Sequence, residues 1–324
     1  MTSNPAALDI VGFGEVLALL QPPAGTSLAT AHHLDLHVAG AEFNACAAAA
    51  ALGARAAFCT RLGTDPLAEQ VVARANELGL ELLAEADAYR PTALFLKDVK
   101  PDGERRVYYY RSTSAAASMD RIDAERGLER HPRAVLISGL TAALGDGPKR
   151  MVERVSELAA NRGIAVALDV NLRPQLGRVQ ESVDSIRTIL PTVSILLVGL
   201  DDAKLLFDEI EPDRIAEAAR ATGCSEVVIT AGAGGSWWQE EDGTMRHQET
   251  LATTIVDPVG AGDAFAGSYL AARLSGLDAR AACWLGSAFA AAVIAQTGDT
   301  AGLPDSVQAR ALMDQAESFA EAAS

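Results

Sequence analysis

Six short apolar runs recur along the chain, with stretches of helical character between them. Runs of this length, rich in Val, Leu, Ile and Ala, are typical of strands that are buried on both faces of a parallel sheet. Strands that alternate with helices predict an α/β fold, with a mainly parallel sheet between two layers of helices. The runs are "LDIVGFG", "AAFCTRLG", "AVLISGL", "AVALDVN", "ILLVGL" and "VVITAG".

Several of these runs end in Gly, Asp or Asn. The carboxyl ends of the strands are where open α/β sheets collect their ligands, so these polar ends are candidate site positions.

Two regions interrupt the alternation of strands and helices. Residues 15–40 and 91–112 have the character of β-hairpins, with turn signals at "PPAG" and "PDGE". Because both regions leave the main pattern and return to it, they predict a small extra sheet that forms a lid. The 324 residues are therefore expected to form a single domain, 1–324, that carries this lid.

Composition limits the possible partners and the compartment. Lys and Arg total 27 against 43 Asp and Glu, a net charge of −16, and no local basic patch offsets it, so we expect no nucleic acid partner. The start of the chain lacks a signal peptide and the most apolar run, "ACAAAAALGARAAF", suits a buried helix, so we expect a cytoplasmic protein with no membrane contact. The four cysteines have no CxxC spacing and are expected to fill the core.

The stretch "IVDPVGAGDAFAG" at residues 255–267 is the strongest local signal for a binding site. The sequence predicts a strand ending in "TTIVD" and a helix starting near "GDAFAG". Gly260 and Gly262 allow backbone N–H groups to turn toward one point, where the helix dipole adds to an anion site. Asp263 falls in the first helical turn and is expected to stay ionised and weakly basic, which suffices for phosphoryl transfer. The alternative is an ordinary helix start with an acidic cap.

Other glycine clusters are less specific. No Gly-Lys-Ser/Thr sequence exists, which excludes a P-loop, and "GFGEV" lacks the third glycine of a dinucleotide fingerprint, which disfavours a dehydrogenase. The stretch "ITAGAGGSWW" follows a strand, and it could cradle a nucleotide or simply connect a strand to a turn. The three histidines of "HHLDLH" lack a further ligand nearby, so we favour no metal site there.

Several stretches in the same order together resemble the ribokinase-like (PfkB) sugar kinases, over nearly the whole chain. They are "VAGAEFNACAAAAALGARAAFCTRLGTDPLAEQV", "RRVYYYRSTSAA", "DVNLRP", "GAGDAFAG" and "GDTAGLP". The second and third are similar to features of the ketodeoxygluconate kinases within that family. The resemblance implies a ribokinase-like fold and an enzyme that uses ATP and Mg²⁺ to phosphorylate a sugar hydroxyl. Among the possible sugars, it favours 2-keto-3-deoxygluconate.

The resemblance also implies roles for particular residues. Asp263 would remove the hydroxyl proton, and the N–H groups of Gly260, Ala261 and Gly262 would hold the phosphoryl group. The substrate-binding residues would be Gly40, Asn44, Phe95, Tyr109, Arg111 and Arg173, with Gly232, Gly235, Gly260 and Gly262 at the nucleotide. An arginine has a use here because a sugar acid carries a carboxylate.

Each substrate-side role has a structural alternative. Asn44 could cap the alanine-rich helix. The "YYYR" run could be an ordinary strand with Arg111 in solvent. Arg173 could pair with Asp169, and Glu42 could be a solvated or helix-start charge.

The chain also departs from the family pattern. Ala39 replaces a glycine that often precedes Gly40, and Phe95 replaces a tyrosine. The family's Asn-x-x-Glu is "GLDD" at residues 199–202, which leaves the metal ligands unknown and is compatible with Mg²⁺ held by phosphates and water.

The competing hypotheses are another kinase of this fold, acting on fructose, ribose or a nucleoside, and a non-catalytic sugar- or nucleotide-sensing protein. Apolar lid strands, "ALFL" and "VYYY", predict a homodimer joined through the lid.

Overall fold

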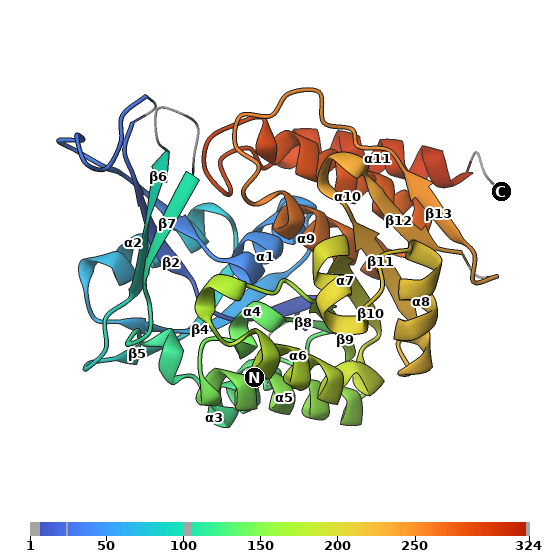
Figure 1. Ribbon diagram of the computed structural model, residues 1–324, viewed down its shortest axis with the longest axis horizontal. Helices are drawn as coiled ribbons and strands as arrows, with labels where there is room; N and C mark the ends of the chain where they lie inside the picture. Colours follow the sequence, from blue (N-terminus) through green and yellow to red (C-terminus); the bar gives the residue numbers. More distant parts are fainter. Residues whose placement is uncertain (1–6, 24, 100–104, 241, 322–324) are drawn as a thin grey trace, which may run out of the picture.

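A large mixed sheet forms the centre of the protein (Figure 1). The structure is a computed structural model that describes residues 7–23, 25–99, 105–240 and 242–321. Within these ranges the strand order is β13-β12-β11-β10-β9-β8-β1-β4-β5, parallel from β5 to β11 and antiparallel at β12 and β13. The strands are β1 (Ile10–Phe13), β4 (Ala56–Gly63), β5 (Glu81–Asp87), β8 (Ala134–Ser138), β9 (Ala165–Asp169), β10 (Ile195–Gly199), β11 (Glu226–Thr230), β12 (Ser236–Gln239) and β13 (Met245–Gln248).

All six apolar runs form strands of this sheet, which confirms the predicted fold class. Sequence reading missed three strands, β5, β12 and β13, and all three lie at or near the edges of the sheet. β5 has Glu81, Glu85 and other exposed positions. An edge strand buries less of its surface than a central one, so it carries a weaker apolar signal.

Helices cover both faces of the sheet and form two hydrophobic cores. One core lies under α1 (Ala41–Ala51), α2 (Pro66–Glu77), α9 (Ala261–Leu274), α10 (Ala279–Ile294) and α11 (Ser306–Glu321). The other core lies under α3 (Arg121–Leu128), α4 (Gly139–Ala142), α5 (Asp146–Asn161), α6 (Val179–Ile189), α7 (Leu200–Phe207) and α8 (Pro212–Ala221). Short 3-10 turns are η1 (Ala116–Ser118), η2 (Pro174–Leu176), η3 (Leu190–Thr192) and η4 (Gly232–Gly234).

A second sheet, which we call the small sheet, stands at one end of the molecule, on the left in Figure 1. Its order is β3-β2-β6-β7, with β2 (Leu17–Gln21), β3 (Asp35–Ala39), β6 (Ala93–Val99) and β7 (Arg105–Tyr110). These strands come from the two regions that interrupt the α/β pattern. The turn expected at "PDGE" lies outside the described residues, as does Ala24 of "PPAG".

Helices α1 and α9 pack so closely that their backbones almost touch. A Cβ added to Gly267 of α9 would lie 1.8 Å from the carbonyl oxygen of Ala45 in α1. The alanine-rich run therefore provides a narrow helix, α1, before the chain turns into β4. All four cysteines are buried free thiols, as core-filling residues should be.

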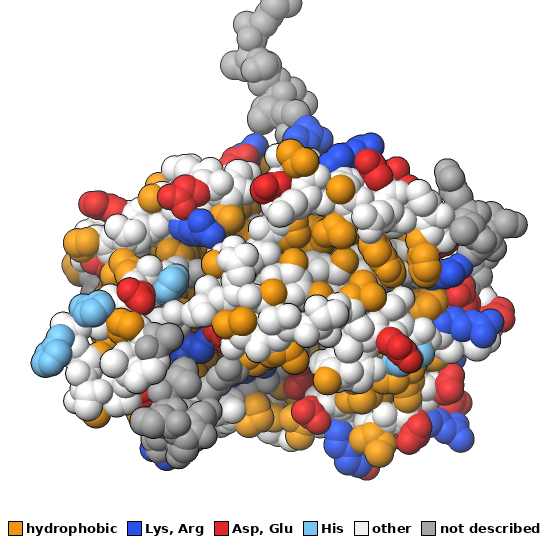
Figure 2. Space-filling model, turned by 90° about the horizontal axis from the view of Figure 1, so that it is seen from above, with side chains coloured by type: hydrophobic (Ala, Val, Ile, Leu, Met, Phe, Trp, Pro, Cys, Tyr) orange, Lys and Arg blue, Asp and Glu red, His pale blue; other side chains and the backbone are white. Residues whose placement is uncertain are grey.

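Charges are dispersed over the face of the molecule that Figure 2 shows. The face in Figure 2 mixes acidic and basic side chains with hydrophobic ones, and its described residues form no continuous basic surface. Within the described ranges, every helix is too short or too polar to cross a lipid bilayer.

Candidate active site

The carboxyl ends of three neighbouring strands open into a cavity of about 440 Å³. Asp169 ends β9, Gly199 ends β10 and Thr230 ends β11, and all three line the cavity. Because Asp202, Asp263 and Asp299 also line it, we call it the carboxylate cavity. It lies where a parallel sheet is expected to bind ligands.

The start of helix α9 forms one wall of this cavity. Gly260 precedes the helix with a left-handed φ of 84°, and a Cβ there would lie 2.6 Å from the carbonyl oxygen of Asp299. In the described part of the chain, no protein acceptor bonds the N–H groups of residues 260–263, whereas the N–H of Ala264 already donates to Gly260 O. A Cβ on Gly262 would meet no atom within 4 Å. The helix start therefore presents free donors to open space, as an anion site requires.

The segment before α9 is not the strand that the sequence predicted. Residues 253–257 have no strand structure. The N–H groups of Val256 and Asp257 both donate to the carbonyl oxygen of Ile294, at the end of α10, at 2.8 and 3.2 Å. Ile255 and Val256 are largely exposed, so this apolar run lies along a helix end and does not join the sheet.

Asp263 lies partly buried in the carboxylate cavity and accepts a hydrogen bond from Asn44 Nδ2 at 2.8 Å. Burial raises the pKa of Asp263 to about 7, against the lowering effect of this bond, and the charge of Asp299 raises it further. The prediction of an ionised, weakly basic carboxylate is therefore wrong. Loss of water outweighs the nearby helix start, and the carboxylate is a stronger base.

Asn44 does not cap helix α1. Gly40 holds the N-cap position, and the first turn has no side-chain cap. Asn44 is 2% exposed, and its Oδ1 is buried without a hydrogen-bond partner among the described residues. Its amide thus binds the carboxylate on one side and has a free acceptor on the other. Gly40 lines the same cavity, and its glycine is required because a Cβ would lie 2.5 Å from Glu15 O.

Sequence reading missed Asp299 and Lys97, which also line the cavity. Burial raises the pKa of Asp299 to about 6, while Lys97 lowers it and Asp257 raises it. Burial also raises the pKa of Asp169 well above its usual range, and the charges of Asp263 and Asp202 add to that shift. Asp299 falls within "GDTAGLP", a stretch of family resemblance, so that match was the available signal.

Arg111 is not in solvent, as one interpretation of "YYYR" held. It is 7% exposed and its Nε donates to Glu15 Oε2 at 2.6 Å, while its guanidinium lies 5.1 Å from the ring centre of Tyr109. Its Nη2 is buried and has no hydrogen-bond partner in the described residues. Tyr109 lines the cavity opposite Phe95, with ring centres 5.7 Å apart.

Arg173 is exposed and lines the same cavity. Its Nη1 donates to Leu172 O at 3.2 Å, and it forms no ion pair among the described residues. The alternative, in which Arg173 pairs with Asp169, is therefore wrong. Of the two arginines, Arg173 has fewer interactions with the protein. Asn171, two residues earlier, donates to Asp169 at 3.1 Å and leaves its Oδ1 buried without a partner in the described chain.

Glu42 is a helix-start charge but not a solvated one. It is 2% exposed, and its Oε1 accepts hydrogen bonds from Ser138 and Thr141. Burial raises the pKa of Glu42, against the lowering effect of the two hydroxyl donors. The side chain occupies the space beside Gly14, where an added Cβ would lie 2.5 Å from Oε2.

A second cavity of about 440 Å³ lies on the other side of the α9 start, and we call it the apolar cavity. Gly232 and Gly235 line it, together with apolar side chains of α9 and α10 and the 250–258 segment. Gly262, Thr230 and Pro258 line both cavities, so the two spaces meet at the helix start. The apolar residues are Ala233, Ala252, Ile255, Pro258, Ala261, Phe265, Ala290, Ala291 and Ile294.

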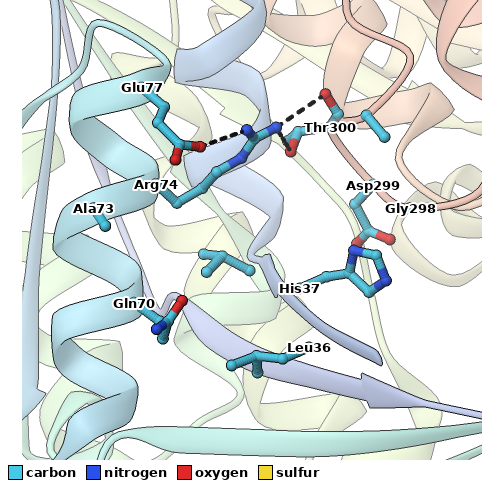
Figure 3. Close-up of a pocket in the computed structure, with 11 residues that line it drawn as sticks. Leu36, His37, Gln70, Ala73, Arg74, Glu77, Gly298, Asp299 and Thr300 are labelled. Carbon is cyan, nitrogen blue, oxygen red and sulfur yellow. Dashed lines mark hydrogen bonds and ion pairs between the residues drawn. The ribbon is translucent and has the colours of Figure 1, made fainter. Parts of the chain in front are cut away.

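A groove of about 410 Å³ lies behind the loop that carries Asp299 (Figure 3). Arg74 reaches across it from α2 and donates to Thr300 Oγ1 at 2.9 Å, while it also pairs with Glu77. Asp299 lines this groove as well as the carboxylate cavity. The loop is thus held from behind by α2, next to the residue that faces the cavity.

Known proteins resemble this chain in sequence and in fold. Residues 7–306 match the model of the pfkB family carbohydrate kinases. The chain is 30% identical to a 2-dehydro-3-deoxygluconokinase of Thermoproteus tenax over 95% of both chains. It is 29% identical to a 2-dehydro-3-deoxygalactonokinase of Haloferax volcanii over 93% of this chain and 95% of that one.

Among solved structures, a PfkB protein from Polaromonas sp. JS666 superposes with a TM-score of 0.84 at 28% identity, over 94% of this chain and 100% of that one. The family model covers nearly all of the described chain, including every residue that lines either cavity. The protein belongs to the pfkB family of carbohydrate kinases.

Proposed function

We propose that the protein transfers the γ-phosphoryl group of ATP to the primary hydroxyl of 2-keto-3-deoxygluconate. One observation carries the proposal: free N–H groups at residues 260–263 lie beside Asp263, where the two cavities meet. A phosphoryl group at that point would have donors for its equatorial oxygens and a base on the acceptor side. Phosphoryl transfer depends mainly on such positioning and charge stabilisation.

The apolar cavity suits the nucleotide. Its apolar walls can cover the adenine ring. Gly232 and Gly235 have no side chains, so the backbone there can approach the nucleotide closely. Gly232 has a left-handed φ of 54°, and an added Cβ would meet no atom within 4 Å. The γ-phosphate would then extend past Gly262 into the carboxylate cavity.

The carboxylate cavity suits a sugar acid. The free Oδ1 of Asn44 can accept a hydrogen bond from a substrate hydroxyl, and the free Nη2 of Arg111 can donate one. Gly40, Phe95 and Tyr109 would complete the wall, and Arg173 would bind the substrate carboxylate.

Asp263 would accept the hydroxyl proton as the oxygen attacks phosphorus. A pKa of about 7 lies near neutral pH, which suits a general base better than an ordinary carboxylate does. The hydrogen bond from Asn44 fixes one carboxylate oxygen and leaves the other for the substrate.

Mg²⁺ would neutralise phosphate charge when bound with ATP. The described residues contain no cluster of three His, Cys, Asp or Glu side chains that could hold a metal ion alone. Asp202 and Asn171, whose Oδ1 has no partner among the described residues, line the cavity and would supply oxygen ligands. This sparse oxygen set fits an ion that keeps most of its waters and phosphate ligands.

The direct test is an ADP-release assay across 2-keto-3-deoxygluconate, 2-keto-3-deoxygalactonate, fructose, ribose and adenosine. We expect the two keto acids to be preferred, and Arg173→Met to raise their KM more than that of fructose. Preference for a neutral sugar or nucleoside would assign another kinase activity, and no ADP release with any substrate would favour a sensing protein.

The Asp263 role is tested by Asp263→Asn, which should keep substrate binding and lower turnover about 100-fold or more. Asp278→Asn is the matched control, because Asp278 caps α10 and lines neither cavity. A fully active Asp263→Asn enzyme would refute the assignment.

We also propose a cytoplasmic homodimer joined through the small sheet. Tyr108 and Tyr110 are 42% and 61% exposed on β7, at the edge of that sheet. Unpaired edges with apolar side chains favour strand pairing. Sedimentation should give a dimer, and a monomer at assay concentrations would exclude it.

A further inference from the structure

One lysine of the small sheet is buried at the carboxylate cavity. Lys97 in β6 is 4% exposed, and its ammonium pairs with the carboxylate of Asp257, itself 5% exposed. A lysine is rarely so buried unless it is paired. The pair joins two different parts of the protein, because Lys97 belongs to the small sheet and Asp257 to the segment that leads into α9.

Asp257 is close to the free N–H groups in both sequence and space. Its Oδ1 lies 3.4 Å from the N–H of Val259, which precedes Gly260. Its own N–H is anchored to Ile294 O, at the end of α10. A carboxylate bonded in this way fixes the turn at residues 257–260, and with it the direction of the amides that follow.

The loop that carries Asp299 also interacts with Lys97 and with the turn before α9. Gly260 can approach Asp299 only because it lacks a Cβ. Lys97 lowers the pKa of Asp299, whose carboxylate lines the cavity. One ammonium group therefore interacts with two acids that lie on the two loops flanking the α9 start.

Stability alone is a weak explanation for such a pair. Removing two charges from water costs about as much as their attraction returns, so a buried ion pair adds little net stability, although breaking it is costly. A directed contact between two parts of a protein does fix their relative position. Phe95, two residues from Lys97 on the same strand, faces the same cavity.

We propose that Lys97 is a positioning residue, which ties the phosphate-binding turn 257–260 to the small sheet through Asp257. The inference rests on the proposed role of the amides at residues 260–263. In this arrangement, the small sheet that contacts the sugar also sets the orientation of the amides that hold the phosphoryl group. Substrate binding and phosphoryl alignment are thereby coupled through one ion pair.

The experiment compares Lys97→Met, Lys97→Arg, Asp257→Asn and the double variant Lys97→Met/Asp257→Asn. We expect Lys97→Met to lower kcat by about 10- to 100-fold, since small misplacements of reacting groups have effects of this size, with little change in the KM for the sugar acid. Lys97→Arg should recover most of the lost kcat. The double variant should be no slower than the slower single one, because both changes break the same contact.

The control for a general loss of stability is Arg61→Met. It breaks one of the two ion pairs of the fully buried Asp123, which Arg126 also contacts, and neither Arg61 nor Asp123 lines the carboxylate cavity or the apolar cavity. This variant should lower the melting temperature and leave kcat unchanged. If Lys97→Met does not fold, Asp257→Asn carries the test, because it keeps the shape of the side chain and removes only the charge.

An unchanged kcat in Lys97→Met and Asp257→Asn would overturn the proposal. A raised KM with unchanged kcat would also overturn it, because Lys97 would then contact the sugar directly. Additive losses in the double variant would mean that the residues act separately. Asp263→Asn is measured alongside: if it loses turnover while the Lys97 variants do not, only the positioning role fails, and if it stays active, the proposed site itself fails.

Discussion

The amide of Asn44 should control the pH at which the enzyme becomes active. Asn44 Nδ2 donates a hydrogen bond to Asp263 at 2.8 Å and stabilises the ionised carboxylate. This bond lowers the pKa of Asp263, whereas burial raises it by disfavouring the ionised form. A hydrogen bond to a charged group contributes about 1.5–3 kcal/mol, and one pKa unit corresponds to about 1.4 kcal/mol. Replacing Asn44 by Leu should therefore raise the pKa of Asp263 by about 1–2 units, from its value of about 7.

The sign follows from the role of the base. Only ionised Asp263 accepts a proton, so kcat/KM falls as the pH drops through its pKa, and the acidic limb of the Asn44→Leu profile should move to higher pH. At pH 7 the ionised fraction should fall from about one half to about one tenth or less. Because Asp299 lies close and has a raised pKa of about 6, the limb reports the coupled pair.

The assay is kcat/KM for the sugar acid between about pH 5.5 and 9.5, with the coupling enzymes in excess at each pH. Asn171→Gly is the matched control: it removes a buried amide of the same cavity that donates to Asp169, and glycine accepts the left-handed φ of 36° found there. Its limb should move less than that of Asn44→Leu. A limb in Asn44→Leu that stays in place or moves to lower pH would refute the reasoning.

Four further substitutions test the geometry of the site. Gly262→Ala should fold normally, because its Cβ meets open space, but should lower kcat about 10-fold or more by crowding the phosphoryl group. Gly267→Ala should instead lower stability by about 1–3 kcal/mol in a denaturant titration, and equal stability of the two variants would contradict this contrast. Arg111→Met should cost about 3–5 kcal/mol of stability because buried Glu15 loses its positively charged partner and keeps only the hydrogen bond from Ser114. The loss should shrink when Glu15→Gln is added, and no such rescue would exclude the pair as the cause. Ala290→Phe should fill the apolar cavity and raise the KM for ATP without changing that for the sugar, and the reverse pattern would place the nucleotide elsewhere.

Local sequence patterns predicted the central part of the fold and the start of α9. A strand buried on both faces needs an unbroken apolar run, so β1, β4 and β8 through β11 could be identified. The strands β5, β12 and β13 could not, because β5 and β13 are edge strands with mixed residues and β12, next to the edge, is short and only alternately buried. The segment at residues 253–257 was wrongly predicted to be a strand for the opposite reason: it is apolar, but Ile255 and Val256 remain largely exposed beside the end of α10.

Charges were harder to predict, because their state depends on partners distant in the sequence. Asp263 and Asn44 are 219 positions apart, and Lys97 and Asp257 are 160 apart. No local pattern indicates such pairs, so the buried Lys97 was overlooked and the basicity of Asp263 was underestimated. Glu42 gave the same difficulty: its place at a helix start was predictable, but its burial between Ser138 and Thr141 was not.

The near contact of α1 and α9 has a consequence for how this enzyme can vary. Asn44 lies on one helix and Asp263 on the other, so the spacing of the two helices sets the separation of the proposed base and the amide. Asn44 Nδ2 and Asp263 Oδ2 are 2.8 Å apart, and a hydrogen bond is lost when its two heavy atoms are about 3.5 Å apart. The helices can therefore move apart by less than the length of one carbon–carbon bond before this hydrogen bond breaks. With Asp263 in its proposed role, enlarging an alanine between the helices is expected to slow the enzyme while the residues that line the cavities stay unchanged.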